Sequence, residues 1–530
     1  MLAGTAVAYR YHFTSAGAAP VGAAAATASQ EGVVAFRQTK ALGRTFSRLD
    51  GSPPDTTISM DSVPATDRPT IPSDMRATGL STEYRRMLAL HERLRPLKIL
   101  AKNRRILAEG GWILVAQALS VTSGLVLVRI LTAHLSPVQY GELALGLTAA
   151  GLVNQVVMGG ISAGIARHYT IASDARDLHN YLRDSRLLLQ LASIAVLGIG
   201  GVLSGALHVL GRGQWLNLTA ACLVFSVFAG YVGALDGIQN AARHRSVVAF
   251  HMALVACLRI ALSLAFLHWL GPSGASVAGG YACTMALATA SHILVLRRTI
   301  SQATPASITR ASWARKIWEY SWPISTWGGF TWMQQVSDRW ALETFASLDA
   351  VGQYAVLFQL GYTPTLMLVG VGTTLVGPIL YQRAGDATDH VRTAKVHRIG
   401  WLLTIATLSI AAFGFTSAFF LHDLVFRIFV AEDYRSCSYL LPWIVLAGGV
   451  FSAGQVLGLK LMSELRTRTM TVAKIATALA GVSFNFIGAR FMGLQGVVAA
   501  LVLFSSIYLA WMLVLGRSPE TRSSRSPDRS

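Results

Sequence analysis

The sequence is short of charged residues and of cysteine. Asp, Glu, Lys and Arg make up only 13% of its 530 residues, whereas soluble proteins contain about 25%. This shortage, with a mean hydropathy of +0.47, excludes an ordinary water-soluble domain. Of the four cysteines, Cys222, Cys257 and Cys283 fall in apolar runs and Cys437 stands alone. No disulfide framework or metal-ligand spacing is visible.

Acidic residues and nucleotide-binding motifs are also scarce. The chain has 26 acidic against 45 basic residues, a net charge of +19. In a soluble domain this excess would suggest nucleic acid as a partner. Here the cations lie between apolar runs, where the positive-inside rule places them, so we expect no nucleic acid. The P-loop pattern is absent, so ATP-driven transport by a nucleotide-binding domain of this chain is excluded. No motif indicates a cofactor or a metal.

Long apolar runs are what the sequence has in abundance. Many reach about 20 residues, the length that spans a bilayer as a helix. The alternation expected of a membrane barrel is missing, and lipid cannot satisfy an open backbone. We therefore predict an all-α polytopic membrane protein with about twelve transmembrane helices, at approximately 110–132, 139–165, 186–207, 216–236, 247–268, 274–296, 319–340, 352–380, 399–420, 438–459, 471–488 and 494–515.

Basic residues alternate between successive predicted loops. Most Lys and Arg residues fall in every second loop and in the segments that flank the first and last spans. The loops on the opposite side contain only Arg212, Arg427, Arg435 and Arg490. Because a miscounted span would scramble this alternation, the positive-inside rule predicts that both termini lie in the cytosol.

These features divide the chain into six segments. Residues 1–80 are rich in Ala, Gly, Ser, Thr and Pro, which predicts a disordered extension or a wrongly assigned start. The other predicted segments are a basic cytosolic flank at 81–109, an N-terminal six-helix bundle at 110–298, a basic cytosolic linker at 299–318, a C-terminal six-helix bundle at 319–516 and a disordered basic tail at 517–530.

The two bundles contain related segments. In the first, an apolar helix ends near Arg129, a short polar turn follows, and a long Gly-rich helix begins at Tyr140-Gly141. A weaker copy in the second bundle aligns Gly141 with Gly352 and Ser136 with Ser347. Repeated halves are common in transporters, whose substrate site lies near the midplane between them.

Both segments resemble the polysaccharide-transport family of the multidrug/oligosaccharidyl-lipid/polysaccharide exporter superfamily, over roughly residues 105–515. The residues that carry the resemblance are Arg129, Leu131, Leu135, Pro137, Tyr140 and Gly141 in the first half, and Ser337-Asp338-Arg339, Val351-Gly352-Gln353-Tyr354 and Pro378 in the second. The long stretch before the first helix departs from the family pattern.

The resemblance implies two six-helix bundles that open alternately to each side of a bacterial inner membrane. It implies a flippase for undecaprenyl-pyrophosphate-linked oligosaccharide repeat units, used in making O-antigen, lipopolysaccharide or exopolysaccharide. Polysaccharide polymerase and chain-length machinery are partners that this role suggests. A catalytic residue is not expected.

Arginines within spans are the candidate substrate contacts, because a lipid pyrophosphate carries concentrated negative charge. Arg259 lies deep in the span 247–268, where an Arg costs roughly 2.5–3.5 kcal/mol on insertion scales and should face the bundle interior. Its alternative role is to pair with a carboxylate or with backbone carbonyls. Arg129 and Arg339 lie near the outer ends of their spans, where they either enter the cavity or snorkel to the interface.

Two carboxylates are candidates for ion coupling. Asp338 adjoins Arg339 but points about 100° away from it on a helix, and it either binds a cation or proton or ends the helix. Glu142 opens the second span, where a helix N-terminus favours a carboxylate in any case. We expect Asp236 to be interfacial and Lys474 to be a snorkelling anchor. Of Trp322, Trp327, Trp332 and Trp340, we expect at most one to stack on sugar.

Three other functions compete with this flippase. A peptidoglycan lipid II flippase is close, but such proteins usually have two further helices. A multidrug/cation antiporter of the same superfamily should hold acidic residues facing its cavity, and this chain has few. A membrane-embedded polymerase or ligase generally needs a large external loop with paired acidic, Arg or His groups. The loop at 421–438, with His422, Asp423, Glu432 and Asp433, is the only candidate and is short.

Overall fold

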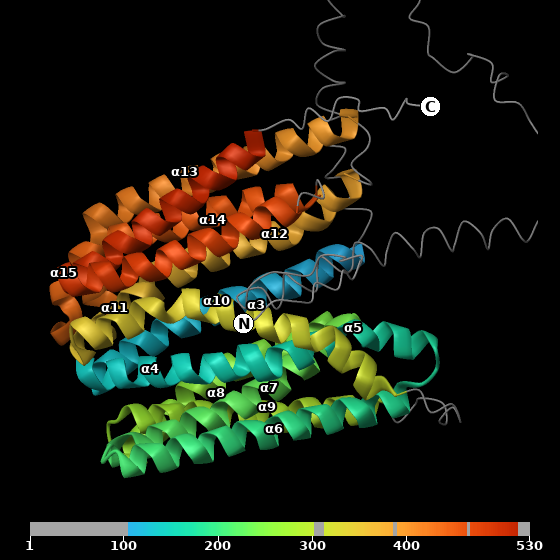
Figure 1. Ribbon diagram of the computed structural model, residues 1–530, viewed down its shortest axis with the longest axis horizontal. Helices are drawn as coiled ribbons and strands as arrows, with labels where there is room; N and C mark the ends of the chain where they lie inside the picture. The colour runs from blue at the N-terminus through green and yellow to red at the C-terminus, as the bar shows by residue number, and fades with distance from the viewer. Residues whose placement is uncertain (1–103, 301–311, 385–389, 464–466, 518–530) are drawn as a thin grey trace, which may run out of the picture. The chain divides into compact units, whose positions relative to one another are not determined.

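The computed structural model describes residues 104–300, 312–384, 390–463 and 467–517, and these form helices without a β-strand (Figure 1). The predictions for residues 1–80 lie outside the described residues, as do most of those for 81–109 and 517–530. The chain divides into two compact units, one at Val33–Leu114 and a larger one that includes Val115–Ser530. The following account concerns the larger unit.

The first half of the described chain contains seven α-helices, two of them joined by a π-helical segment. Their bounds are α3 Arg104–His134, α4 Pro137–Val153, η3 Asn154–Gly159, α5 Gly160–Asp174, α6 Leu178–Val209, η4 Gly213–Trp215, α7 Leu216–Ala241, α8 Arg245–Leu270 and α9 Gly274–Ile300. Helices α4, η3 and α5 form one continuous apolar segment, Pro137–Asp174, long enough to cross a membrane.

The second half repeats the plan of a long helix followed by a helix with a π-helical segment. Its elements are α10 Trp313–Phe345, α11 Leu348–Leu357, η5 Phe358–Tyr362, α12 Thr363–Ala384, α13 His390–Phe429, η6 Glu432–Leu440, α14 Leu441–Ser463 and α15 Thr467–Arg517. Helix α15 is interrupted at Gly493, whose φ of 55° and ψ of −130° are not helical. Glycine adopts this conformation without the clash that a Cβ would bring, so the break falls between the two last predicted spans.

Nine helices among the described residues are long and apolar enough to cross a membrane. They establish a polytopic helical membrane protein, while the number twelve and the cytosolic termini stay predictions. Helix α10 is not among the nine. It carries Asp338 and Arg339, and its low hydropathy is explained by the polar residues that it presents to a cavity described below.

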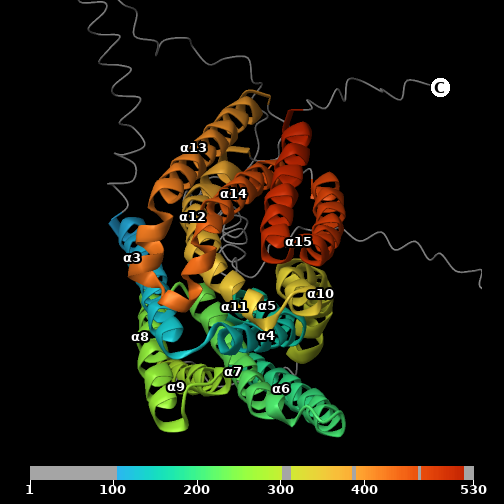
Figure 2. The ribbon, with the colours of Figure 1, turned by 90° about the vertical axis from the view of Figure 1, so that its left-hand side faces the viewer.

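The helices pack in two groups (Figure 2). In the N-terminal group, α7 contacts α4, α5, α6, α8 and α9, and in the C-terminal group α14 contacts α12, α13 and α15. Helix α10 contacts both groups. Its first half packs on α5, where Gly160 and Gly164 leave no room for a Cβ beside Ser325 and Ser321. Its second half packs on α15, where Asn485 donates a hydrogen bond to Ser337 Oγ at 2.9 Å. Small residues commonly allow such close approach between membrane helices.

The two repeated segments meet at the starts of α4 and α11. Ser136 Oγ accepts a hydrogen bond from the backbone N–H of Gln139 at the start of α4, at 3.4 Å. Ser347 Oγ accepts one from Ala350 at the start of α11, at 3.1 Å. A Cβ on Gly141 would collide with the Leu348 carbonyl, and one on Gly352 with the Pro137 carbonyl. The residues aligned from sequence therefore occupy equivalent places and face each other.

Candidate functional site

A cavity of about 700 Å³ lies among helices of both groups. Its lining comes from α3, α4, η3, α8, α9 and α10 and from α11, η5, α12, α14 and α15. Most lining side chains are apolar or aromatic, and its charged lining residues are Arg259, Asp338, Arg339 and Lys474. Its volume is within the range of small-ligand sites. The lining therefore combines three cations with a single carboxylate.

Arg259 is placed in the cavity by α8. Its guanidinium carbon lies 5.1 Å from the centroid of the Tyr281 ring, a cation–π contact. Its Nε atom is buried without a hydrogen-bond partner, and no described residue forms an ion pair with it. A carboxylate or carbonyl partner, the alternative role for this residue, is thus absent from the described part of the chain. An anionic ligand would supply the missing partner.

Arg339 and Asp338 form a pair at the cavity wall. Asp338 Oδ1 accepts hydrogen bonds from the backbone N–H of Arg339 at 2.7 Å and from its guanidinium at 3.2 Å. Asp338 Oδ2 accepts one from the Tyr354 hydroxyl at 2.6 Å. The Arg339 guanidinium also lies 4.6 Å from the centroid of the Phe358 ring. The carboxylate is therefore neutralised within the protein, and the net charge of the cavity lining stays positive.

Lys474 is a cavity residue that the sequence analysis missed. It is half-buried on α15, and its Nζ lies 3.5 Å from Gln455 Oε1. The Ser452 and Tyr508 hydroxyls line the same cavity and are buried without hydrogen-bond partners. A lysine close to the start of a span is usually an interfacial anchor. Its proximity to Gln455 depends on the packing of α15 against α14, which spacing alone does not reveal.

Arg129 lies outside the cavity lining and joins distant parts of the chain. Its guanidinium donates a hydrogen bond to the Val430 carbonyl at 2.7 Å. The backbone N–H of Ala431 donates to Thr132 Oγ1 at 3.1 Å, and the Tyr434 hydroxyl donates to the Leu135 carbonyl at 2.8 Å. We call these three hydrogen bonds the α3–η6 latch, because they tie the end of α3 to the segment that leads into η6.

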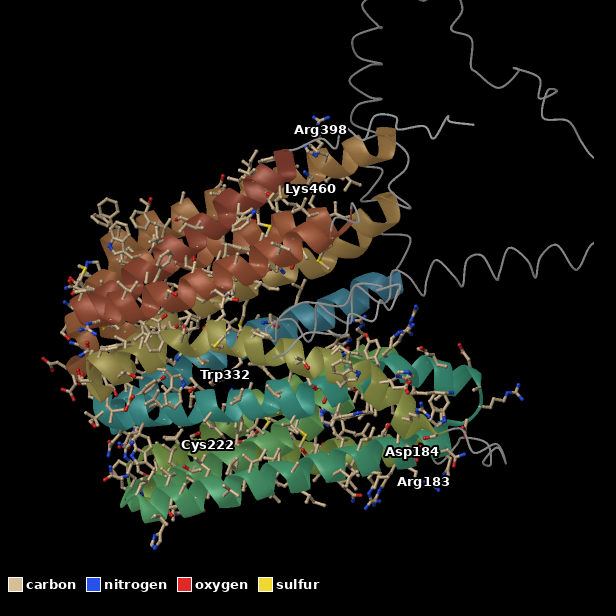
Figure 3. All side chains as sticks on the ribbon, viewed as in Figure 1. Arg183, Asp184, Cys222, Trp332, Arg398 and Lys460 are labelled. Carbon is tan, nitrogen blue, oxygen red and sulfur yellow. The ribbon has the colours of Figure 1, made fainter. Side chains whose placement is uncertain are left out.

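The remaining candidates are spread over the fold. Glu142 is half-buried in the second turn of α4, outside the cavity lining, and no described residue bonds to its carboxylate. Trp332 on α10 lines the cavity and donates through Nε1 to the Thr148 carbonyl at 2.7 Å (Figure 3). Trp322 is 54% exposed, and the Trp327 side chain lies outside the described residues. Within the described ranges, no three His, Cys, Asp or Glu residues are arranged to hold a metal.

Comparison of sequences identifies a family. Residues 106–384 match the family described as polysaccharide biosynthesis protein. No curated protein matches the chain in sequence.

Solved structures share the fold at low sequence identity. The lipid II flippase MurJ in an inward closed conformation is 12% identical, with 78% of this chain and 88% of that one covered and a TM-score of 0.59. An inward-facing multidrug resistance MATE family transporter of the MOP superfamily is 15% identical, with 76% and 94% covered and a TM-score of 0.56. An outward-facing structure of a MATE family transporter has a TM-score of 0.53 at 15% identity, with 78% and 94% covered. These likenesses concern the arrangement of helices.

Proposed function

The chain belongs to the polysaccharide biosynthesis protein family, and from this premise we propose that it is a flippase for lipid-linked oligosaccharide repeat units. The lipid would be undecaprenyl pyrophosphate, and the membrane a bacterial inner membrane. The product serves O-antigen, lipopolysaccharide or exopolysaccharide synthesis. Polymerase and chain-length machinery are the partners that would consume it.

One observation carries this proposal. The cavity is lined by Arg259, Arg339 and Lys474, and its single carboxylate already bonds to Arg339 and Tyr354. An unpaired cation in a membrane-embedded cavity is costly unless an anion or water reaches it. Charge-assisted hydrogen bonds from Arg and Lys are the usual means of holding phosphate oxygens. The pyrophosphate fits the cations, and the sugars fit the hydroxyl and amide groups beside Lys474.

Each candidate residue, inside or outside the cavity lining, then has a role. Arg259 is the principal contact for the pyrophosphate, and Arg339 and Lys474 are further contacts. Arg129 acts as a positioning residue that holds α3 to the segment before η6. Asp338 and Glu142 remain candidate carboxylates for coupling to a cation or proton.

Transport would proceed by alternating access, with the lipid tail in the bilayer and the head group in the cavity. The distribution of basic loops assigns the starts of α4 and α11 to the external side. The glycine contact at these starts and the α3–η6 latch would then close the cavity toward the outside. Opening this end while the other closes would release the head group.

A multidrug/cation antiporter of the same superfamily is the second candidate. The similarity in fold to MATE family transporters favours it. An organic cation needs uncompensated negative charge, and the carboxylate that lines this cavity is compensated by Arg339. We therefore favour an anionic substrate. A membrane-embedded polymerase or ligase is a weaker alternative, since Asp423 and His422 bond to each other and to Ser438.

A deletion experiment tests the function. Cells that lack the gene should accumulate lipid-linked repeat units on the cytosolic leaflet and make no polymer. The leaflet is determined by accessibility of the labelled sugar to a membrane-impermeant glycosidase. Accumulation of single units on the external leaflet would exclude the flippase and indicate a polymerase or ligase.

A further inference from the structure

Three titratable side chains meet inside the N-terminal group, away from the cavity. Asp236 comes from α7, His251 from α8 and His292 from α9, and none of them lines the cavity. The two imidazole rings stack with centroids 3.4 Å apart and an interplanar angle of 14°. His292 Nε2 lies 3.3 Å from Asp236 Oδ1. Ionisable groups within membrane helices are costly and commonly belong to proton or ion pathways.

The hydrogen bonds of His251 determine which tautomer the ring adopts when it is neutral. Its Nδ1 lies 2.8 Å from the Val247 carbonyl, which only accepts, so Nδ1 carries the hydrogen. Its Nε2, 3.1 Å from Ser291 Oγ, then accepts from that hydroxyl. On protonation Nε2 gains a hydrogen and the serine hydroxyl can turn to accept it. The site therefore accommodates either state without moving a heavy atom.

His292 has unused hydrogen-bonding capacity. Its side chain is fully buried, at 0% exposure, and neither ring nitrogen makes a hydrogen bond of good geometry within the described chain. Asp236 Oδ1 is likewise buried without a hydrogen-bond partner. A proton on His292 Nε2 would convert the close approach to Asp236 into a charge-assisted hydrogen bond.

The surrounding charges limit the site to one proton. His251 stacks on His292, which in turn lies 3.3 Å from Asp236 Oδ1. Arg243 and Arg245 lie in or beside the turn between α7 and α8, at the end of α8 that carries His251. One imidazolium is balanced by the Asp236 carboxylate, whereas two stacked imidazolium rings would repel each other.

The geometry points to a proton rather than a metal ion. Ring nitrogens hold their lone pairs in the ring plane, so two stacked rings do not direct them at one point. Among the described residues, no group of three His, Cys, Asp or Glu is arranged to hold a metal. Alkali and alkaline-earth cations prefer oxygen ligands, of which this cluster offers few. We propose that Asp236, His251 and His292 form a site that binds and releases one proton during transport.

Helix α8 links this proton site to the cavity. It carries His251 and Arg259 about two turns apart, roughly 12 Å along the axis. A proton at the cluster and an anion at Arg259 attract each other through the helix bundle, so each should strengthen binding of the other. Asp236, with 27% of its side chain exposed, gives the proton access that the buried histidines lack. This coupling role rests on the proposed flippase function, whereas proton binding itself does not.

Proton binding can be measured without transport. The full chain in lipid nanodiscs, with ¹⁵N-labelled histidine, would be titrated by NMR from pH 5 to 8, the range in which histidine usually changes charge. Signals lost in His251→Gln and His292→Gln identify the pair among the 13 histidines. The expected result is that both rings shift together and share one proton. His268→Gln, exposed at the other end of α8, is the control and should leave the pair unchanged. Two independent protons, or no shift across this range, would overturn the site.

The coupling is measured in proteoliposomes that contain the labelled lipid-linked oligosaccharide. Asp236→Asn and His292→Gln should lose the stimulation of flipping by a pH gradient and keep flipping at uniform pH. His268→Gln should retain the wild-type stimulation. If the wild type titrates as expected but does not flip lipid, the proposed function fails and the proton site stands. If the wild type flips lipid and a pH gradient stimulates flipping equally in the wild type and all variants, the coupling is overturned and the proposed function stands.

Discussion

Arg259 is a cation whose side-chain nitrogens have no described partner, and its replacement should remove function while sparing the fold. We expect Arg259→Ala to reduce export at least tenfold with unchanged protein level, because no hydrogen bond or ion pair of the described chain is lost. Arg259→Lys keeps the charge but loses the planar fork, so it should retain part of the activity. Polymer at the cell surface and protein in the membrane are measured together.

The matched control is Arg212→Ala, which removes a cation from the turn between α6 and α7 where the side chain is exposed. It should export at the wild-type level. Normal export by Arg259→Ala would remove this residue from the mechanism.

The hydrogen bond from Tyr354 to Asp338 stabilises the C-terminal group. Tyr354 is fully buried, and its hydroxyl lies 2.6 Å from Asp338 Oδ2. Tyr354→Phe should lower the free energy of unfolding by about 1.5–3 kcal/mol, the usual contribution of a hydrogen bond to a charged group. The measurement is thermal unfolding of the purified protein in detergent. Tyr439→Phe, whose side chain is 47% exposed, should change stability far less, and equal effects in both would contradict this reasoning.

The location of an individual residue was predictable where its depth within a predicted membrane span was enough to determine it. Arg259 lies too deep to snorkel, and the structure places it in the cavity. Asp338 and Arg339 were expected to diverge by about 100°, but the flexible arginine side chain returns to the carboxylate of its neighbour. The interfacial position of Asp236 stays a prediction, and its approach to His292, which follows from the packing of α7 beside α9, was not predicted. Such contacts depend on tertiary packing that a single sequence does not specify.

At the scale of elements, the paired starts of α4 and α11 depend on two glycines. Gly141→Ala should prevent the close approach, since its methyl group would collide with the Leu348 carbonyl. We expect lower thermal stability and reduced export. Gly205→Ala on α6 is the matched control, because no atom lies within 4 Å of its Cβ position. It should be neutral or stabilise the helix by up to about 1 kcal/mol. Equal losses in the two variants would contradict a specific contact at Gly141, because a methyl group at Gly205 meets no other atom and alanine favours the helix.

Helices were largely predictable from apolar runs and turns. Most predicted spans match described helices within several residues, because lipid permits few alternatives to a helix. The extensions beyond the apolar runs, such as the length of α13 from His390 to Phe429, were not predicted. The π-helical segments η3 and η5 were also missed, since their sequences give no distinct pattern. Glycines pointed to flexible or closely packed helices without showing which neighbour they approach.

At the scale of the whole molecule, the α3–η6 latch can be made permanent. In a chain whose four natural cysteines are replaced by serine, Thr132→Cys with Ala431→Cys should form a cross-link under oxidising conditions. Thr132 Oγ1 lies 3.1 Å from the Ala431 backbone nitrogen. If this end must open, the cross-linked protein should stop flipping lipid, and a reductant should restore it.

The control is each single cysteine variant under the same oxidation, which should flip normally. Unimpaired flipping by fully cross-linked protein would show that this end does not open during transport. The repeat in the sequence predicted two related segments and aligned Gly141 with Gly352, but it did not predict that these two glycines meet. It did not predict the latch, whose partners lie about 300 residues apart with no shared pattern.

Helix α10 packs against both helix groups, and this double contact restricts any large motion of one group relative to the other. Its first half packs against α5 and its second half against α15. The two groups cannot move apart as rigid bodies while α10 stays straight and keeps its contacts with both. Either α10 releases one partner or it flexes between the two attachments, at Gly328-Gly329, which follow the α5 contact that contains Pro323. If transport moves the two groups apart, the helix that presents Asp338 and Arg339 to the cavity must therefore bend or release a partner in each cycle.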